Sequence, residues 1–515
     1  MIKRHLLRSL KLSLPVCLLL VLVAFPTTAL AHGDGGREAS AIAGPAAWGF
    51  LGFGALVIGA VSVILFTGRP DRRSAVRAAN FGKLTGFGGY IAKMRLFSRN
   101  ARLFMVHVVG MDVIYGTWHV LFNLYLLAVG FDVAFIGLRI LLSSAAAAVA
   151  SIPAGMISDR IGRKLSFILG DGVGAAMSLI AISTTNPTLL LGTAVVGGIF
   201  AALHGVAEPA FMAENSESFE RVHLFSVSDG TRTAAAIIGS ALAGLVPLVF
   251  AGVDQSARVE LYRLVAYIGI GGWFASLIPA IMLRRTATVR ATNHARGRRV
   301  FANVKHPGRI WRLTAPEVLI GFGAGFALPL MNVFFNRGLD SPEVEIGATF
   351  AAGQAFLVVG SFLAPLVAVR LGKVNSVVFT RMASIPFILL IAFSPDVGSV
   401  IGSVLTVAGL AYVARITLMN MASPVRSAFG MEILDPEERS TQVGIQLALS
   451  SAVSGLASYA GAQLMNVGDF RTPFLLMAGF YLAANLLFWI FFAGREKELA
   501  LVLPIEGAKV VVSEG

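Results

Sequence analysis

The sequence predicts an all-α membrane protein, and three observations support this: composition, the placement of charge, and an internal repeat. Charged side chains make up 14% of the 515 residues and hydrophobic ones 56%, with a mean hydropathy of +0.77. Soluble domains carry about 25% charged residues, so this chain is too apolar to cover a water-facing surface. Because one span needs about 20 apolar residues, the length accommodates roughly twelve to fourteen membrane-spanning helices.

The net charge of +14 is concentrated in two segments. Residues 68–102 hold nine Lys or Arg and one acid, and residues 284–312 hold nine Lys or Arg and no acid. Cytoplasmic loops of membrane proteins collect such residues, so both segments are predicted to be cytoplasmic and an even number of spans separates them. Orientation and attraction to anionic lipid explain this charge, and we expect a lipid bilayer rather than nucleic acid as the partner.

The first 31 residues have the three parts of a secretory signal peptide. Basic residues precede an apolar run at 12–25, and small residues occupy positions 29 and 31 before the expected cut. An uncleaved first span is the alternative. We expect a short exported segment at 32–45, an extra transmembrane helix at 46–67 and a basic cytoplasmic linker at 68–103. The chain has a single cysteine, Cys17, which excludes disulfides and cysteine-based metal sites from the mature protein.

Twelve further apolar segments follow, in two sets of six. The sets form a predicted N-terminal bundle at 104–283 and a predicted C-terminal bundle at 313–493, with a basic cytoplasmic central loop at 284–312 and a cytoplasmic tail at 494–515. The predicted spans lie near 104–129, 134–157, 165–184, 189–213, 222–250 and 260–283, then near 313–336, 346–369, 376–394, 399–421, 441–465 and 470–493.

The two sets repeat each other weakly, which indicates two homologous halves. Such halves are the architecture of many secondary transporters, whose site lies between them. The matched residues are Phe211, Glu214 and Arg221 with Phe429, Glu432 and Arg439, at an offset of 218, and Phe122-Asn123 with Phe335-Asn336.

A loop motif stands between the second and third of these helices. It reads Gly155-x-x-x-Asp159-Arg160-x-Gly162-Arg163-Lys164, and it resembles the G-x-x-x-D-R-x-G-R-K signature of the major facilitator superfamily. The resemblance covers about residues 104–493 and implies the twelve-helix fold of that family, with two pseudo-symmetric six-helix bundles that move a solute by alternating access. The second half has a degraded copy at 370–373.

The chain departs from the drug:proton antiporters of that family in two places. Residues 189–213 contain no Arg, although those antiporters carry one in the fourth helix, and the fifth helix lacks their Gly-Pro motif. Both departures argue against drug efflux and favour another solute.

A polar stripe on the first helix of the twelve is the first candidate site. Asp112, Tyr115, His119 and Asn123 are spaced at i, i+3, i+7 and i+11, which places them on one helical face. Ionisable groups inside a bilayer usually face a cavity or a partner, and the resemblance implies that the first, fourth, seventh and tenth helices line the central cavity. We expect a proton or substrate site here, with Asp112 as the first proton carrier. Plain helix–helix hydrogen bonding is the alternative.

The fourth and tenth helices supply the other candidates. His204 and Glu208 lie on the fourth, and Glu208 is the second candidate proton carrier. Arg415 and Arg426 lie on the tenth, and Arg415 is the candidate for an anionic group of the substrate. Under the offset of 218, Glu208 corresponds to Arg426, so we predict that these two form a salt bridge that closes an inner gate.

Other polar residues in the spans receive weaker roles. Asp229 and Arg232 are three apart and are expected to neutralise each other. Asp171 and Arg381 are expected to pack between helices, and Asn332 and Asn336 to offer neutral contacts.

The sequence therefore predicts a secondary active transporter of a small solute, driven by a proton gradient. We expect a monomer in the inner or plasma membrane of a prokaryote, with a cytoplasmic C-terminus, no cofactor, no metal and no catalytic residue. Eight scattered His do not form the cluster that an enzyme would need. A non-transporting sensor or assembly factor is the alternative, and within transport so is efflux of a drug or metabolite by proton antiport. The residues do not identify the substrate.

Overall fold

The computed structural model describes residues 93–94, 96–216, 218–249, 255–284, 305–401, 403–434 and 436–494. The predicted signal peptide, exported segment and extra helix lie outside these residues. So do most of the two basic segments and nearly all of the tail.

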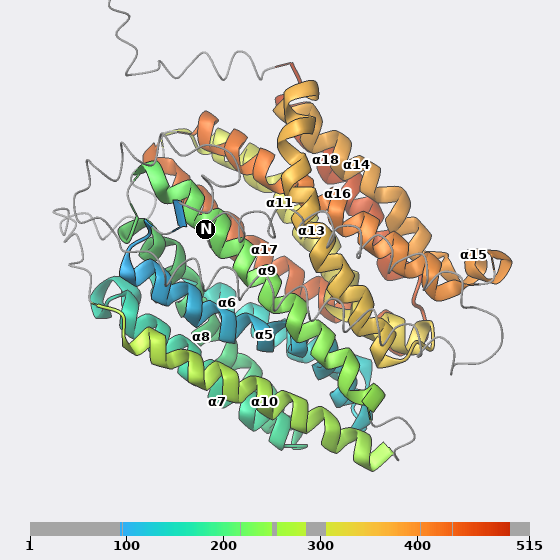
Figure 1. The fold of residues 1–515 in the computed structure, drawn as a ribbon. Helices are drawn as coiled ribbons and strands as arrows, with labels where there is room; N and C mark the ends of the chain where they lie inside the picture. The colour runs from blue at the N-terminus through green and yellow to red at the C-terminus, as the bar shows by residue number, and fades with distance from the viewer. Residues whose placement is uncertain are drawn as a thin grey trace, which may run out of the picture.

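All regular structure in the described residues is helical (Figure 1). The N-terminal half contains α5 (Arg99–Ala128), α6 (Val133–Ile161), α7 (Arg163–Ser183), α8 (Pro187–Glu214), α9 (Ser218–Val249) and α10 (Gln255–Ile281). The C-terminal half contains α11 (Pro307–Ala327), a broken segment of η1 (Leu328–Leu330), α12 (Met331–Val333) and η2 (Phe334–Gly338), then α13 (Glu343–Leu371), α14 (Lys373–Ala392), the short α15 (Ser394–Ile401), α16 (Val404–Ile433), α17 (Pro436–Asn466) and α18 (Thr472–Phe492).

Ten helices within the described residues are long and apolar enough to cross a membrane. They are α5, α6, α7, α8, α10, the run from α11 to η2, α14, α16, α17 and α18. The remaining two long helices, α9 and α13, carry charged residues near their starts and pack among these ten. The predicted all-α membrane fold is confirmed.

The turn before the third helix of each half uses the same backbone device. Gly162 ends α6 and begins α7 with φ 87°, and Gly372 ends α13 and begins α14 with φ 79°. A positive φ of this size favours glycine because it has no Cβ. The tight turn predicted at Gly162 is therefore present, and the C-terminal half repeats it.

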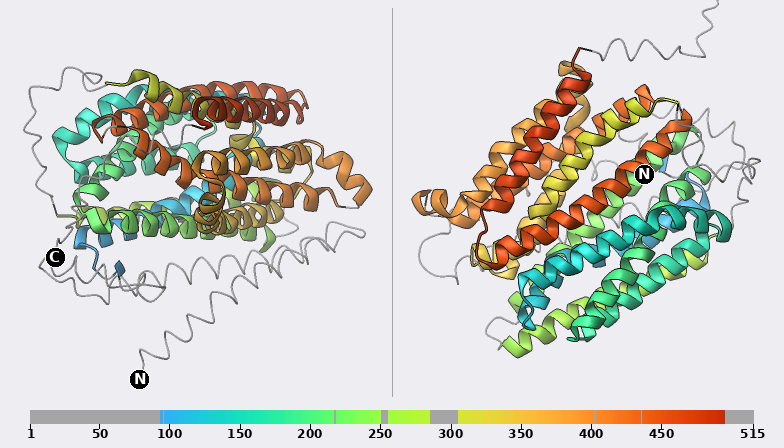
Figure 2. Two further views of the ribbon diagram at one scale, coloured as in Figure 1. Left: turned by 90° about the horizontal axis from the view of Figure 1, so that it is seen from above. Right: turned by 180° about the vertical axis from the view of Figure 1, so that it is seen from behind.

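The two halves are separate bundles joined along two seams (Figure 2). In the N-terminal half α5 packs on α9 and α10, while α8 packs on α6 and α7. In the C-terminal half α11 packs on α17 and α18, while α16 packs on α13 and α14. Between the halves, α6 lies along α17 and α9 lies along α13.

Glycines bring the backbones of both seams close together at one end of the bundle. We call this the outer end, because α5 ends and α6 begins there and the sequence predicts that it faces outside. A Cβ on Gly347 of α13 would lie 2.7 Å from the Cα of Gly244 of α9, and a Cβ on Gly137 of α6 would lie 2.2 Å from the Cβ of Ala462 of α17. Small residues allow such close packing of membrane helices.

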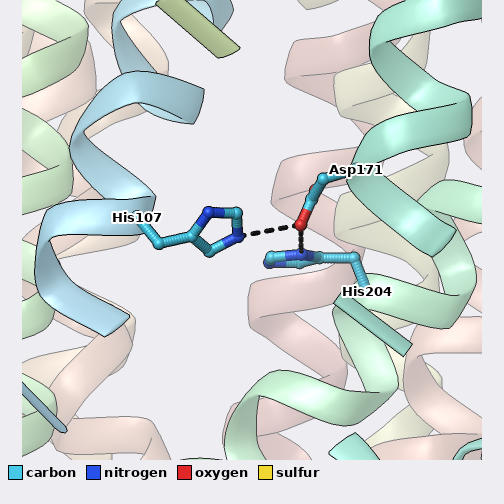
Figure 3. Close-up of side chains that lie close together, drawn as sticks. All are labelled: His107, Asp171 and His204. Atoms are coloured by element: carbon cyan, nitrogen blue, oxygen red, sulfur yellow. Dashed lines mark hydrogen bonds and ion pairs between the residues drawn. The ribbon is translucent and has the colours of Figure 1, made fainter. Parts of the chain in front are cut away.

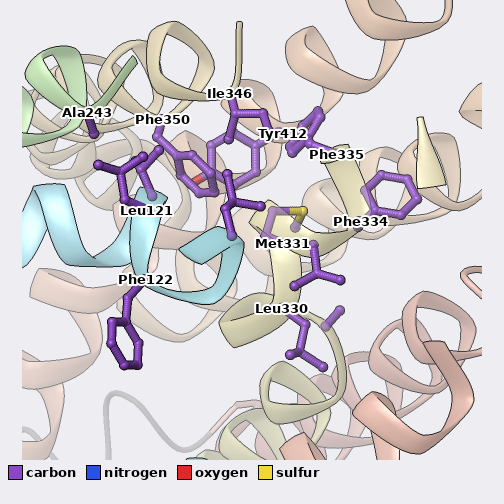
Figure 4. Close-up of a cluster of buried hydrophobic side chains, with 14 of the residues drawn as sticks. Leu121, Phe122, Ala243, Leu330, Met331, Phe334, Phe335, Ile346, Phe350 and Tyr412 are labelled. Carbon is purple, nitrogen blue, oxygen red and sulfur yellow. The ribbon is translucent and has the colours of Figure 1, made fainter. Parts of the chain in front are cut away.

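An apolar cluster fills the space between the halves near the same end (Figure 4). Leu121 and Phe122 come from α5 and Ala243 from α9, and they lie in one cluster with Phe350 of α13 and Tyr412 of α16. The outer end is thus held by both backbone contact and buried side chains.

Candidate functional site

A chain of buried polar side chains runs through the N-terminal half. It begins where three helices meet (Figure 3). The Nε2 atom of His107 on α5 lies 2.9 Å from Oδ2 of Asp171 on α7, and the Nδ1 atom of His204 on α8 lies 2.9 Å from the same oxygen. All three side chains are buried.

The chain continues from His204 to the polar stripe of α5. The Nε2 atom of His204 lies 3.3 Å from Oε2 of Glu208. Arg232 on α9 donates from Nη1 to both carboxylate oxygens of Glu208, at 2.6 and 2.7 Å, and from Nε to Oδ2 of Asp112 at 3.1 Å. We call these six side chains the N-half cluster: His107, Asp171, His204, Glu208, Arg232 and Asp112.

The N-half cluster carries more negative than positive charge. Asp112, Asp171 and Glu208 supply three carboxylates, and Arg232 supplies one guanidinium, which leaves two negative charges when both imidazoles are neutral. Buried ions are costly unless they are paired. The cluster is therefore built to hold additional positive charge.

The orientation of His107 is set by a backbone carbonyl. Its Nδ1 atom lies 2.8 Å from the carbonyl oxygen of Ser276 on α10, which can only accept a hydrogen bond. The Nδ1 atom therefore carries the proton, and Nε2 faces Asp171. His107, Asp171 and His204 each offer a ligand atom within 4.8 Å of the others, so within the described residues this trio could hold a metal ion.

The C-terminal half has a second cluster, of opposite charge. Arg381 on α14 donates from Nη1 and Nη2 to the two oxygens of Glu317 on α11, at 2.8 and 3.2 Å. The Nε atom of Arg426 on α16 lies 3.5 Å from Glu317, and its Nη1 donates to Gln446 at 3.3 Å. Two guanidiniums and one carboxylate make up this C-half cluster, which is net positive.

The two clusters lie at matching positions of the repeat. Asp171 and Arg381 each stand nine residues after the glycine that begins their helix. Glu208 and Arg426 each stand three residues before a buried phenylalanine, Phe211 or Phe429. Equivalent sites thus hold acids in one half and bases in the other.

The polar stripe of α5 faces the C-terminal half at its outer part. Asn123 donates to Oδ1 of Asn332 on α12 and to the carbonyl of Pro329, both at 3.0 Å, and Asn332 donates back to the carbonyls of His119 and Val120. One turn further inward, the His119 ring meets the Phe350 ring edge-on at 5.3 Å. Asn336 instead donates within its own half, to the carbonyl of Ser341.

Tyr115 lies one more turn inward on the same face, and it is 59% exposed. Asp112, the next member of the stripe, is buried and bonded to Arg232. The stripe therefore joins the seam between the halves at one end and the N-half cluster at the other.

Arg415 is a buried cation in the middle of α16. It is 4% exposed, and its Nη2 donates to the hydroxyl of Tyr481 on α18 at 2.7 Å. Its Nε atom is buried without a hydrogen-bond partner, and among the described residues no carboxylate pairs with it. An aromatic chain links this region to the stripe, since the Phe350 and Tyr412 rings lie 5.3 Å apart.

The predicted gate residues do not meet in this structure. Glu208 is bonded to Arg232 and lies 3.3 Å from His204, and Arg426 lies against Glu317 and Gln446, so each is held within its own half. The gate remains a prediction about another conformation.

The loop motif holds the ends of three helices together. Arg163 bonds to Glu214 at the end of α8, at 3.0 Å, and to Asp159, at 2.7 Å. Lys164 donates to the carbonyl of Ile281 at the end of α10. Gly155 is half-buried in the last part of α6, and Arg160 is exposed at the end of that helix.

Five members of the two clusters were not predicted as functional candidates: His107, Asp171, Arg232, Glu317 and Arg381. His107 is five residues from Asp112 and so falls outside the stripe. Arg232 was expected to serve Asp229, whereas its donors reach Asp112 and Glu208 on two other helices. A usable signal was present, because each of these is an ionisable group within a predicted span.

Comparison with known proteins decides the family. The profile of the Major Facilitator Superfamily matches residues 103–423, which is more than half of the chain. The chain belongs to the Major Facilitator Superfamily.

Its relatives within the superfamily are distant. The methylenomycin A resistance protein of Bacillus subtilis strain 168 is 23% identical over 397 residues, which cover 66% of this chain and 83% of the relative. The crystal structure of the nucleoside transporter NupG matches with a TM-score of 0.60 and 16% identity, over 76% of this chain and 99% of NupG. The xylose transporter XylE from E. coli, in an inward open conformation, matches with a TM-score of 0.59 and 13% identity, over 79% of this chain and all of XylE.

These matches confirm the predicted family and its general function. The protein is a multi-pass secondary transporter of the Major Facilitator Superfamily, and such transporters bind small-molecule solutes within the membrane. At these identities the solved structures establish the fold and leave the substrate open.

Proposed function

We propose that this transporter is proton-coupled, that twelve helices form its transport domain, and that it moves a small organic anion across the inner membrane of a prokaryote. The arrangement of two residues on α5 carries the proposal. Asp112 is a buried carboxylate, and Tyr115, one turn away on the face toward the other half, is exposed.

Exposure along α5 indicates a space between the halves. His119 contacts Phe350 of the other half, yet Tyr115, one turn further inward on that face, is 59% exposed. The halves therefore separate between these two residues, inward of the sealed outer end. This supports a conformation that is closed outside and open toward the cytoplasm, one of the two states of alternating access.

Asp112 is the proposed proton carrier because it lies where the N-half cluster meets that space. In its charged form it accepts a hydrogen bond from Arg232. Protonation removes the charge that holds Arg232 there and leaves the guanidinium to Glu208 alone. Proton binding at Asp112 and solute binding beside Tyr115 would bias the same equilibrium between the two states, and this shared bias couples them.

Arg415 is the proposed anchor for the anionic group of the solute. A buried guanidinium without a carboxylate partner is unfavourable by several kcal/mol, and an incoming carboxylate or phosphate would relieve this cost. A planar fork of N–H donors suits both anions. The rings of Tyr115, His119, Phe350 and Tyr412 offer an aromatic surface for the rest of the solute.

Export by proton antiport is the second candidate within transport. It is favoured by the likeness to the methylenomycin A resistance protein, and a role in resistance suits an exporter. Against it, α8 contains no Arg. The non-transporting sensor or assembly factor differs from both because it would bind a ligand without moving it.

The test is flux in proteoliposomes that hold the full-length protein and a pH-sensitive dye. Addition of a transported anion should move protons, in the direction that identifies symport or antiport. Asp112→Asn should abolish proton movement while solute-for-solute exchange persists, because exchange needs no net proton transfer. The matched control is Asp396→Asn, which alters an exposed pair with Arg471 and should leave both activities unchanged.

Binding of a solute without any flux in the wild type would refute the transport proposal in favour of a sensor. Proton movement that persists in Asp112→Asn would refute the assignment of Asp112.

A further inference from the structure

We propose that His107, Asp171 and His204 form a binding site for a divalent transition-metal ion inside the N-terminal half. The site lies within one bundle, whereas the solute is proposed to bind between the two. The inference therefore goes beyond the proposed function and does not depend on it.

The ligand atoms have a suitable arrangement. The Nε2 atom of His107 and the Nδ1 atom of His204 both point at Oδ2 of Asp171, from 2.9 Å, and all three atoms lie within 4.8 Å of one another. Two ligands bound tetrahedrally to zinc at about 2.1 Å are about 3.4 Å apart. The three side chains would have to part by about half an ångström to admit an ion, a change within the reach of side-chain rotation.

The His107 imidazole is held as metal-binding imidazoles usually are, and the second nitrogen of His204 lies near a carboxylate. A ligating His generally donates its other ring N–H to a carbonyl or a carboxylate, which fixes the tautomer and the direction of the ring. The second nitrogen of His107 faces the carbonyl of Ser276 at 2.8 Å, and that of His204 faces the carboxylate of Glu208 at 3.3 Å. The His107 ring is therefore fixed by a hydrogen bond, whereas Nε2 of His204 lies beside a carboxylate without forming a hydrogen bond to it.

The charge of the surroundings matches a divalent ion. With neutral imidazoles, the carboxylates of Asp112, Asp171 and Glu208 exceed the single guanidinium of Arg232 by two negative charges. One divalent cation makes the N-half cluster neutral.

The ligand set narrows the class of metal. Two imidazole nitrogens and one carboxylate oxygen suit ions of borderline hardness, such as Zn²⁺, Co²⁺, Ni²⁺ and Fe²⁺, rather than Ca²⁺ or Mg²⁺, which prefer oxygen. The equivalent region of the C-terminal half contains Arg381 and Arg426, whose positive charges would repel a cation.

The experiment measures metal binding to the full-length protein, purified in detergent and stripped with a chelator. After loading with Zn²⁺ and desalting, elemental analysis should give one zinc per chain. Co²⁺ should give visible absorption bands that report imidazole and carboxylate ligands, and Zn²⁺ should remove them.

Variants locate the ion. Asp171→Asn and His204→Gln should each lower zinc affinity at least 100-fold, and Glu208→Gln, which touches a ligand but not the ion, should lower it about 10- to 100-fold. His306→Gln removes an exposed histidine of the C-terminal half and should bind zinc as the wild type does.

Zinc well below one per chain in the wild type, or unchanged zinc affinity in both Asp171→Asn and His204→Gln, would overturn the proposal. The wild-type stoichiometry and the Co²⁺ spectrum need no variant, so a variant that fails to fold leaves the test intact. Solute flux is measured separately, so the metal site and the transport proposal can fail independently.

Discussion

The two halves share a backbone plan but carry opposite charge at equivalent places. Gly162 and Gly372 begin matching helices with the same backbone twist, and Phe211 and Phe429 are both buried. Yet Asp171 in one half is Arg381 in the other. The glycine turns and buried phenylalanines that shape each bundle are thus present in both halves, whereas the ionisable side chains inside the bundles differ.

The divergence also concerns the kind of charge. The N-half cluster combines three carboxylates and two imidazoles with a single guanidinium, so added cations would be stabilised there. The C-half cluster contains guanidiniums, which stay charged, and Arg415 lies in the same half. We infer a division of labour in which one half binds cations, as protons or metal, and the other binds the anion.

The largest effect is expected from removing the cation of the N-half cluster. Arg232→Met leaves the carboxylates of Asp112 and Glu208 facing each other without a bridge. Removal of one partner from a buried ion pair costs several kcal/mol, and because Arg232 is partly exposed we expect about 3 kcal/mol. The measurement is the free energy of unfolding in detergent. Arg232→Lys, the matched control, should restore at least half of the loss.

Surface ion pairs contribute less than about 1 kcal/mol to the free energy of unfolding. If Arg232→Met lowered that free energy by no more than this, the N-half cluster would not be an interdependent buried network.

A smaller effect is expected from the corresponding change in the C-half cluster. Arg381→Met removes two hydrogen bonds to Glu317, but Arg426 remains 3.5 Å away and keeps the carboxylate paired. Hydrogen bonds to charged groups contribute about 1.5–3 kcal/mol, so we expect about 2 kcal/mol by the same unfolding assay. A larger loss of unfolding free energy in Arg381→Met than in Arg232→Met would contradict the prediction that the N-half cluster depends more strongly on its arginine.

Much of the fold was predictable because the bilayer restricts it. Apolar runs of span length and the motif around Gly162 each predict structure locally, without knowledge of the partner helices. The break at η1, α12 and η2 was not predicted, although Pro329 was a local signal for it because proline has no backbone N–H to continue a helix.

The site was less predictable because its bonds join helices that are distant in sequence. The spacing from Asp112 to Asn123 gave one face of α5 correctly. No spacing could show that Arg232 reaches back 120 positions to Asp112, or that Asp171 meets a His on each of two other helices. A charged residue within a predicted span indicates that a partner exists, but only the tertiary structure identifies that partner.

The smallest and most state-dependent effect concerns the predicted gate. In this structure Glu208 and Arg426 are bonded within their own halves, so a direct interaction would exist only when the inner ends close. Glu208→Gln keeps the side-chain shape and removes the charge, and Arg426→Gln replaces the charged group with a shorter neutral polar side chain. If the two pair in the closed state, each variant should slow solute flux, and the double variant should lose less than the sum of the two, with a coupling energy of about 0.5–3 kcal/mol. Glu317→Gln combined with Glu208→Gln is the control pair, because both residues carry negative charge and cannot bridge the halves. Additive losses for Glu208 and Arg426 would show that the opposite charges of the two clusters act separately, each through its own half.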